Sequence, residues 1–242
     1  MSYNRRIVFN SVLAPQSLVL SPCLEIVMTR IKICGITRVE DALAAARSGA
    51  DAIGLVFYER SPRHASIAQA KQLADALPPF VTVVGLFVNA EASFVRKVLA
   101  NVPLDLLQFH GDETPEYCAQ FNKPFLKAIR VKAGVDLLQC AADFRSAQGL
   151  LLDAHVEGIP GGTGSAFDWA LIPGHLPLPV ILSGGLNAQN IAAAIGQVRP
   201  YAVDVSSGVE SGGVDAGKGI KDAAQIAAFI NEVKQIDLQL SR

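Results

Sequence analysis

One stretch of the chain decides the expected fold: residues 31–57 read IKICGITRVEDALAAARSGADAIGLVF. It opens with a short apolar run, Ile31–Cys34, that ends at a glycine and is typical of a buried strand. Thr37 and Glu40 then form a capping box, which predicts the start of a helix. A second buried strand is expected at Ala52–Phe57. A strand, a helix and a strand in this order indicate a βαβ unit.

The same alternation continues along the chain. Further strands, each followed by a helical pattern, are expected at Val81–Val88, Asp105–Phe109, Phe125–Val131, Leu150–Leu152, Val180–Leu182 and Ala202–Val205. Ser66, Asn89 and Thr114 are expected to cap helices, and the terminal helix is expected to end near Ile236. Eight strand signals, with no GxGxxG after the first, favour an α/β fold of the single (β/α)8 TIM-barrel type over an open doubly wound sheet.

The composition is that of an ordinary globular protein. Of the 242 residues 50% are hydrophobic and 18% charged, and the net charge is −1. Scattered basic residues give no indication of a nucleic-acid or membrane partner, and no apolar segment reaches the roughly 18 residues of a membrane span. The four cysteines show neither CxxC pairs nor metal-ligand spacing with the histidines. Free thiols in a chain of this length indicate a reducing, cytoplasmic location.

The first 27 residues are expected to form an N-terminal extension outside the fold, and residues 28–242 the barrel domain. Two arginines precede an apolar stretch in this extension, as in a secretory signal, but prolines interrupt the stretch. Met28 directly precedes the first strand, which suggests the hypothesis that translation begins there.

The candidate catalytic residues follow from the fold, because active sites of such barrels lie at the carboxyl ends of the strands. The first strand ends at Cys34, and the second leads to Arg63. The fourth leads to Gln108 and His110, and the sixth delivers Asp153. Taken singly, a buried cysteine is more often a small apolar residue than a catalyst.

The last two strands lead into glycine-rich segments, Ser183-Gly184-Gly185 and Ser206-Ser207-Gly208. Glycines let backbone N–H groups approach an oxyanion closely, and a short helix after the eighth strand would add its positive N-terminal end. The loops after strands seven and eight commonly bind phosphate in this fold. We therefore expect a phosphate site there, with Gly161–Gly164 as a third wall, although Gly-Gly pairs also make plain turns.

Taken in order, these segments resemble the phosphoribosylanthranilate isomerase family, whose opening motif is similar to Lys32-Ile33-Cys34-Gly35-Ile36-Thr37. Similar pieces follow at Ser61–Arg63, Val88-Asn89, Gln108–Gly111, Leu152-Asp153, Gly161–Gly164, Ser183–Leu186 and Asp204–Glu210. The resemblance spans Arg30 to about Ile230. The chain departs from the family pattern in its N-terminal extension and at Gly212–Asp222, which looks longer than the usual turn.

The resemblance implies an Amadori rearrangement of N-(5-phosphoribosyl)anthranilate in tryptophan biosynthesis, with neither metal nor organic cofactor. It implies Asp153 as the general acid and Cys34 as the general base, and Arg63 as the residue that binds the anthranilate carboxylate. The base needs a pKa below the usual value of about 8.5, and the acid one above about 3.9. The expected substrate-binding residues are Arg63, Gln108, His110, Gly162, Gly164, Ser183, Gly184, Gly185, Asp204, Ser206, Ser207 and Gly208.

Other interpretations stay open at this point. A sister barrel isomerase of the histidine pathway uses two aspartates, so Cys34 argues against it. A barrel that binds a phosphorylated metabolite without turning it over would be separated by a turnover assay. A redox role for Cys34 would need a second thiol, and none is adjacent in the sequence. The expected partner is the small phosphorylated substrate alone, and the expected quaternary state is a monomer or a homodimer.

Overall fold

The computed structural model describes residues 28–154, 168–212 and 218–241. Eight parallel strands in these residues close into a barrel in which every strand pairs with its neighbour in the sequence and β1 pairs with β8. The expected (β/α)8 barrel is therefore confirmed. The strands are β1 (Arg30–Cys34), β2 (Ala52–Val56), β3 (Thr82–Phe87), β4 (Leu106–Phe109), β5 (Phe125–Val131), β6 (Gly149–Ala154), β7 (Val180–Leu182) and β8 (Ala202–Val205).

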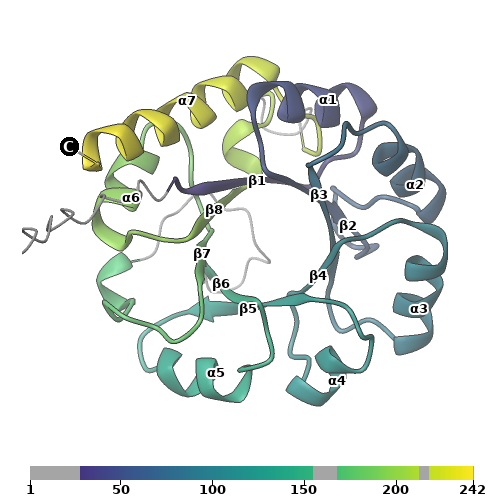
Figure 1. Cartoon of the computed structure of the whole chain (residues 1–242). Coiled ribbons are helices and arrows are strands. Elements are labelled where there is room, and N and C mark those ends of the chain that lie inside the picture. Colours follow the sequence, from purple (N-terminus) through teal and green to yellow (C-terminus); the bar gives the residue numbers. More distant parts are fainter. Residues whose placement is uncertain (1–27, 155–167, 213–217, 242) are drawn as a thin grey trace, which may run out of the picture.

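The helices form a ring around the barrel, as the view along its axis shows (Figure 1). The α-helices are α1 (Val39–Ser48), α2 (Ile67–Asp75), α3 (Ala92–Asn101), α4 (Pro115–Ala119), α5 (Leu137–Asp143), α6 (Ile191–Val198) and α7 (Ala223–Leu240). Two short 3-10 helices, η1 (Trp169–Leu171) and η2 (Ser207–Val209), follow β6 and β8 along the chain.

Alternation along the strands divides the buried side chains between two sides of the sheet. One set packs against the helices and forms the main core, for example Ile33 of β1 and Leu152 of β6. The other set fills the barrel. Its apolar floor consists of Leu126, Ala128, Leu151, Ile181 and Ala202, and Cys34, Val56 and Leu86 cluster near the carboxyl ends of the first three strands. Residues that alternate with the main core therefore point into the barrel.

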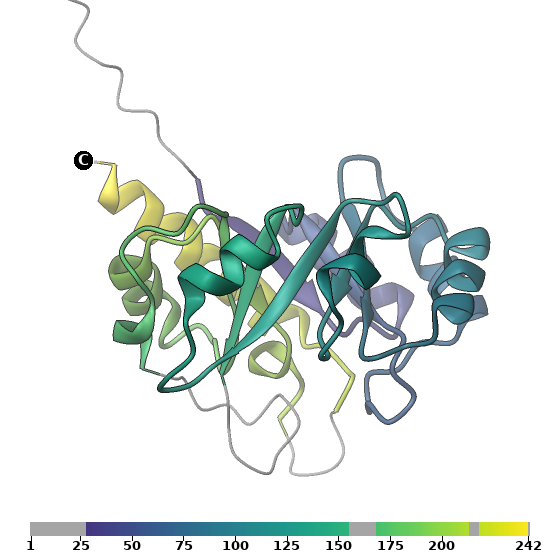
Figure 2. The same ribbon diagram turned by 90° about the horizontal axis from the view of Figure 1, so that it is seen from below.

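The last helix closes the fold over the start of the first strand. The backbone N–H and the hydroxyl of Thr29 both donate to the carboxylate of Asp237 in α7, at 2.7 and 2.8 Å. In the side view, α7 accordingly lies beside the beginning of β1 (Figure 2). This contact joins segments at opposite ends of the sequence.

Two of the predicted helix caps are confirmed. The side chains of Ser66 and Thr114 accept hydrogen bonds from the backbone N–H groups of Gln69 and Tyr117, each at 3.2 Å. Both residues stand at the N-cap, as predicted, and Pro115 follows Thr114 at the first helical position.

Two other cap predictions are wrong, because tertiary contacts take the polar side chains. Thr37 donates its hydroxyl to the carbonyl of Gly219 at 2.5 Å, and α1 begins after Arg38 without a side-chain cap. Asn89 has a positive φ of 47°, and its Oδ1 accepts a hydrogen bond from the N–H of Asp112. The helix after Asn89 begins only at Ala92.

The predicted boundaries agree with the structure to within a few residues. The terminal helix continues to Leu240, four residues beyond the predicted end. The predicted extension at residues 1–27 and the glycine-rich loop at Gly161–Gly164 lie outside the described residues.

Candidate active site

Three reactive side chains stand at the carboxyl ends of the strands. Cys34 ends β1, His110 directly follows β4, and Asp153 is the penultimate residue of β6. Cys34 and Asp153 point into the barrel, because the residue before each packs outward against the helices. Their exposed fractions are 5% and 9%, so both are nearly buried.

A chain of hydrogen bonds connects Asp153 to β4. Its Oδ2 lies 3.1 Å from Nε2 of His110, whose Nδ1 lies 3.0 Å from Nε2 of Gln108. With the Gln108 amide donating to Nδ1, the neutral imidazole carries its hydrogen on Nε2 and donates to Asp153. Gln108 is 0% exposed. Gln108 is therefore connected to Asp153 through the ring of His110.

Cys34 faces a buried ion pair. Lys32 lies two residues earlier on β1, and its Nζ donates to Oδ1 of Asp204 on β8 at 2.8 Å. The hydroxyl of Ser183 donates to the other carboxylate oxygen at 3.4 Å. A Cβ on Gly54 of β2 would stand 2.7 Å from the Cys34 Sγ and 3.1 Å from the Lys32 Nζ. The thiol and the ammonium thus both lie next to Gly54, which has no side chain to separate them.

Burial raises the pKa of the Cys34 thiol above its ordinary value, the Lys32 ammonium opposes this rise, and Asp204 adds to it. The net shift of the Cys34 pKa is therefore upward, opposite to the one a base requires, although a cation that opposes this rise lies nearby. Burial also disfavours the Lys32 ammonium, but the charges of Asp204 and Cys34 outweigh it and raise the pKa of Lys32. Lys32 is accordingly a stable cation beside the thiol.

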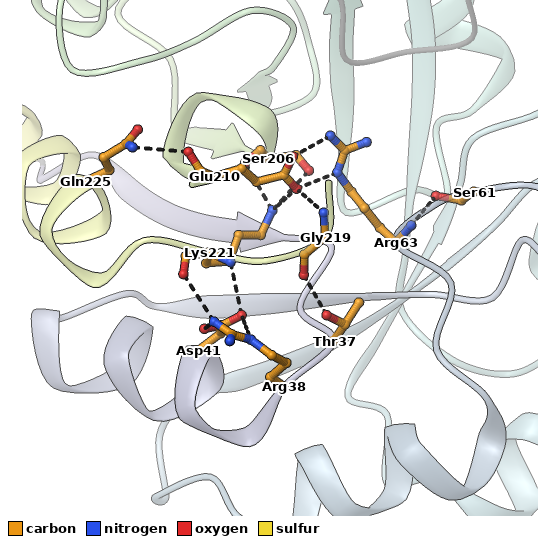
Figure 3. A network of polar contacts seen from close by, with 10 residues as sticks. All are labelled: Thr37, Arg38, Asp41, Ser61, Arg63, Ser206, Glu210, Gly219, Lys221 and Gln225. Atoms are coloured by element: carbon orange, nitrogen blue, oxygen red, sulfur yellow. Dashed lines mark hydrogen bonds and ion pairs between the residues drawn. The ribbon is translucent and has the colours of Figure 1, made fainter. Parts of the chain in front are cut away.

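Arg63, in the loop after β2, is held by Glu210 (Figure 3). Its Nε and Nη2 donate to the two oxygens of Glu210 at 2.7 and 2.8 Å. Lys221 and the backbone N–H of Gly219 donate to one of the same oxygens, at 2.9 and 3.1 Å. Burial alone would raise the pKa of Glu210, but the bond from Arg63 and the charge of Lys221 hold it below its ordinary value. The two hydrogen bonds to Glu210 fix the guanidinium of Arg63 and leave its Nη1 group directed away from the Glu210 carboxylate.

The glycine-rich segments after β7 and β8 lie against each other. Gly184 and Gly185 have φ values of 86° and 65°, which glycine adopts without strain. A Cβ on Gly208 would stand 1.9 Å from the carbonyl oxygen of Leu186, so only glycine allows this approach. The short helix expected after β8 is a single 3-10 turn that begins at Ser207. The other two expected contact residues, Gly162 and Gly164, lie outside the described residues.

Neither a metal cluster nor a membrane span is found in the part of the chain that the structure describes. Among residues 28–154, 168–212 and 218–241, no group of three or more His, Cys, Asp or Glu side chains could hold a metal ion. No helix in these ranges is long and apolar enough to cross a membrane. The cysteines described there (Cys34, Cys118 and Cys140) are all free thiols.

The structure adds three charged residues that the sequence analysis did not select: Lys32, Glu210 and Lys221. Lys32 had a recognisable signal, because a lysine two residues before Cys34 on a strand faces the same side. Lys221 belongs to the segment that departs from the family pattern, yet it is buried and bonded to Glu210. No local pattern indicates that partnership.

These features define the class of the protein: a (β/α)8-barrel enzyme with a thiol, an imidazole and a carboxyl group at the carboxyl ends of its strands. Residues 31–232 match the family described as N-(5'phosphoribosyl)anthranilate (PRA) isomerase. The chain is 62% identical over 205 residues to the N-(5'-phosphoribosyl)anthranilate isomerase of Thiobacillus denitrificans, covering 85% of this chain and 98% of that protein. The chain belongs to the phosphoribosylanthranilate isomerase family.

Two solved structures show the same likeness. Phosphoribosyl anthranilate isomerase from Thermotoga maritima superimposes with a TM-score of 0.76 at 42% identity, covering 86% of this chain and 100% of that one. A phosphoribosyl anthranilate isomerase in complex with reduced 1-(o-carboxyphenylamino)-1-deoxyribulose 5-phosphate gives a TM-score of 0.73 at 41% identity, with the same coverage of 86% and 100%.

Proposed function

We propose that this chain converts N-(5'-phosphoribosyl)anthranilate to 1-(2-carboxyphenylamino)-1-deoxyribulose 5-phosphate by an Amadori rearrangement, as a step of tryptophan biosynthesis. Family membership supports this proposal, and one observation carries it. In the closed barrel, β7 and β8 lie between β1, which ends at Cys34, and β6, which delivers Asp153. A phosphate bound at the ends of β7 and β8 therefore holds the attached ribose between the thiol and the carboxyl group.

The phosphate contacts come from backbone N–H groups and hydroxyls of the two glycine-rich segments. The left-handed backbone of Gly184 and Gly185 can present N–H groups to an oxyanion, which suits a dianionic phosphate. The proposed contacts are Gly184, Gly185, Ser206, Ser207 and Gly208, with Gly162 and Gly164 added from the loop after β6. Ser183, which we also expected there, donates its N–H to Leu152 and its hydroxyl to Asp204 in this structure.

Asp153 is the proposed general acid. Its proton goes to the furanose ring oxygen, the bond from that oxygen to C1 breaks, and the nitrogen lone pair forms the C1–N double bond of a Schiff base. His110 contacts the same carboxyl group and holds it in place, and Gln108 holds the ring of His110. We propose that these two residues position the acid, and that His110 also lines the substrate pocket.

Cys34 is the proposed general base. Its thiolate takes the proton from C2, and the electron pair of that C–H bond forms the C1–C2 double bond of an enolamine. The enolamine becomes the ketone when C1 takes up a proton and the hydroxyl at C2 loses one, so no external oxidant or reductant is needed. The cationic Schiff base lies next to C2, and its positive charge favours the thiolate when substrate is bound. This offsets the rise of the Cys34 pKa that burial causes in the free protein.

Arg63 is the proposed partner of the anthranilate carboxylate. It follows β2, which lies on the far side of β1 from the phosphate segments, so phosphate, ribose and aromatic ring would extend across the mouth in that order. Glu210 holds one edge of the guanidinium, and a planar fork suits a second carboxylate at its free end. Asp204, which we expected among the substrate contacts, lies deeper and is bonded to Lys32.

The test follows the fluorescence of freshly generated N-(5'-phosphoribosyl)anthranilate with the wild type, Cys34→Ala and Asp153→Asn. Turnover by the wild type and a loss of roughly a hundredfold to ten-thousandfold in kcat in each variant are expected, because each variant lacks a general acid–base group. Binding of the reduced product analogue, measured by calorimetry, should persist in both variants. Full rate in Cys34→Ala would exclude the assigned base.

The second candidate is a barrel that binds the phosphorylated metabolite without turnover. The glycine-rich segments at β7 and β8 would serve it equally well. Binding of the substrate by the wild type without any change in fluorescence would favour this alternative. The free thiols fit the cytoplasmic location that we propose.

A further inference from the structure

In the described part of the chain, Lys32 and Asp204 form a charged pair inside the barrel. Lys32 precedes Cys34 by two residues on β1, and Asp204 follows Ala202 by two residues on β8. The pair therefore lies between the apolar floor of the barrel and the cluster of Cys34 near its mouth. Both side chains are 5% exposed, and the ammonium and carboxylate are 2.8 Å apart.

A contribution to the stability of the fold does not explain why an ion pair is buried here. Taking two charges out of water costs free energy that their attraction repays only in good geometry, and apolar replacements of similar volume are often neutral or stabilising. On the neighbouring strand β2 the register partners of Lys32 and Cys34 are the small residues Ala52 and Gly54, which offer the pair no polar side chain. The position of the pair therefore suggests a role in the reaction.

The geometry links the pair to the proposed base. The Lys32 Nζ and the Cys34 Sγ both lie within 3.1 Å of the point where a side chain on Gly54 would begin. Among the described residues, the charged groups with the largest effect on the Cys34 thiol are Lys32 from β1, Asp204 from β8 and Lys221 from the segment before α7. Lys221 is bonded to Glu210 and Ser206, so Lys32 is the cation that shares the interior of the barrel with the thiol.

We propose that Lys32 is a positioning residue of the reaction, whose ammonium, held by Asp204, stabilises the Cys34 thiolate that removes the C2 proton. This inference rests on the proposed function for the step that the thiolate performs. Before proton transfer, the ammonium balances two anions, the thiolate and Asp204. After the transfer the thiol is neutral, and Lys32 and Asp204 remain a balanced pair. Lys32 keeps its proton throughout.

The experiment measures alkylation of Cys34 by iodoacetamide as a function of pH, followed by mass spectrometry of the Cys34 peptide. It needs no substrate, so it reports on Lys32 even if the chain does not isomerise anything. Lys32→Met keeps the unbranched side chain, shorter by one atom, and removes the charge. We expect it to raise the pH midpoint of alkylation by about one unit or more, because an opposite charge a few ångströms away favours the thiolate. Lys32→Arg should restore most of this shift.

Asp204→Asn provides a test of opposite sign, because it removes a negative charge that disfavours the thiolate. We expect it to lower the midpoint of Cys34 alkylation. Lys127→Met is the matched control. Lys127 forms an equally buried pair with Glu113 at 2.9 Å and packs against Phe144 outside the barrel, so its loss should leave the Cys34 midpoint unchanged.

Activity adds a second readout. In Lys32→Met the fall in kcat/KM at neutral pH should match the fall in thiolate, about tenfold for each unit of midpoint shift. Unchanged midpoints in both Lys32→Met and Asp204→Asn would overturn the proposal, even if activity were lost. Shifts of the same sign in the two variants would overturn it as well, because they would indicate general loosening of the barrel. Absence of turnover in the wild type, with opposite shifts preserved, would refute the proposed function and leave the electrostatic role standing.

Discussion

Two buried lysine–carboxylate ion pairs lie on opposite sides of the barrel wall, and the comparison shows that the role of such a pair depends on the side on which it lies. Lys32–Asp204 and Lys127–Glu113 have separations of 2.8 and 2.9 Å, and all four side chains are nearly inaccessible. The charge of each lysine also opposes the rise in the pKa of a nearby thiol: Lys32 for Cys34, and Lys127 for Cys118.

The difference lies in the direction of the side chains. Lys127 points outward, where its ammonium lies 5.6 Å from the centre of the Phe144 ring. Its partner Glu113 accepts hydrogen bonds from the backbone N–H groups of Asn89 and Gly111, and so connects the loops after β3 and β4. Cys118 is 0% exposed within the layer of helices, and burial raises its pKa to about 12. Lys32 points inward, below the mouth where substrate is proposed to bind. The outer pair should therefore affect stability, and the inner pair catalysis.

The largest expected contrast is between the two cysteines. Cys34→Ala should lower kcat by about a thousandfold, because it removes the proposed base. Cys118→Ala should leave kcat within about twofold and lower the free energy of unfolding by about 1 kcal/mol, since it removes one buried sulfur from a packed site. Steady-state kinetics and urea unfolding check both. Equal losses of activity would contradict the division between inner and outer sites.

Breaking the outer pair should be the largest stability effect. Lys127→Met leaves the Glu113 carboxylate buried and uncompensated, which costs about 3–5 kcal/mol of unfolding free energy. Urea unfolding at pH 7 measures the loss, and the double variant Lys127→Met/Glu113→Gln should recover part of it. A loss below about 1 kcal/mol would show that the outer pair is dispensable to the fold.

A smaller effect should come from filling the space beside the inner pair. Gly54→Ala places a methyl group 2.7 Å from the Cys34 Sγ, so the thiol must shift, and we expect kcat/KM to fall about tenfold. Gly196→Ala in α6 is the control, because an added Cβ there meets no atom within 4 Å. That variant should retain activity and gain about 0.5–1 kcal/mol of helix stability. Unchanged activity in Gly54→Ala would contradict a close arrangement of thiol and ammonium.

The smallest expected effect is a pH dependence of stability. The pKa of Cys118 is raised to about 12 in the folded chain, so the unfolded chain loses this proton first as the pH rises. The associated stability is complete below the unfolded thiol pKa of about 8.5 and is lost as the pH approaches the folded value. Thermal unfolding between pH 8 and 9.5 should therefore show a smaller loss in Cys118→Ala than in the wild type, by about 1 kcal/mol. An identical pH slope in both would show that Cys118 does not titrate as proposed.

The alternation of apolar runs and helical patterns was enough to predict the eight strands, because each strand and each helix follows a local periodicity. The ordered motifs were enough to predict the family, and Ser66 and Thr114 were predicted as caps because capping depends on residues three apart. The same local rule was wrong for Thr37 and Asn89. Partners distant in the sequence, Gly219 and Asp112, take their polar groups.

What the sequence alone determined is the barrel, its family, the positions of Cys34 and Asp153 at the ends of strands, and the place of Arg63 in the loop after the second strand. The tertiary structure alone decided which charges meet there: Lys32 with Asp204, and Arg63 with Glu210 and Lys221. Strand periodicity is set by neighbouring residues, whereas closure of the barrel brings together β1 and β8 from opposite ends of the chain. The state of the Cys34 thiol depends on burial and on those charges, and both exist only after the barrel has closed.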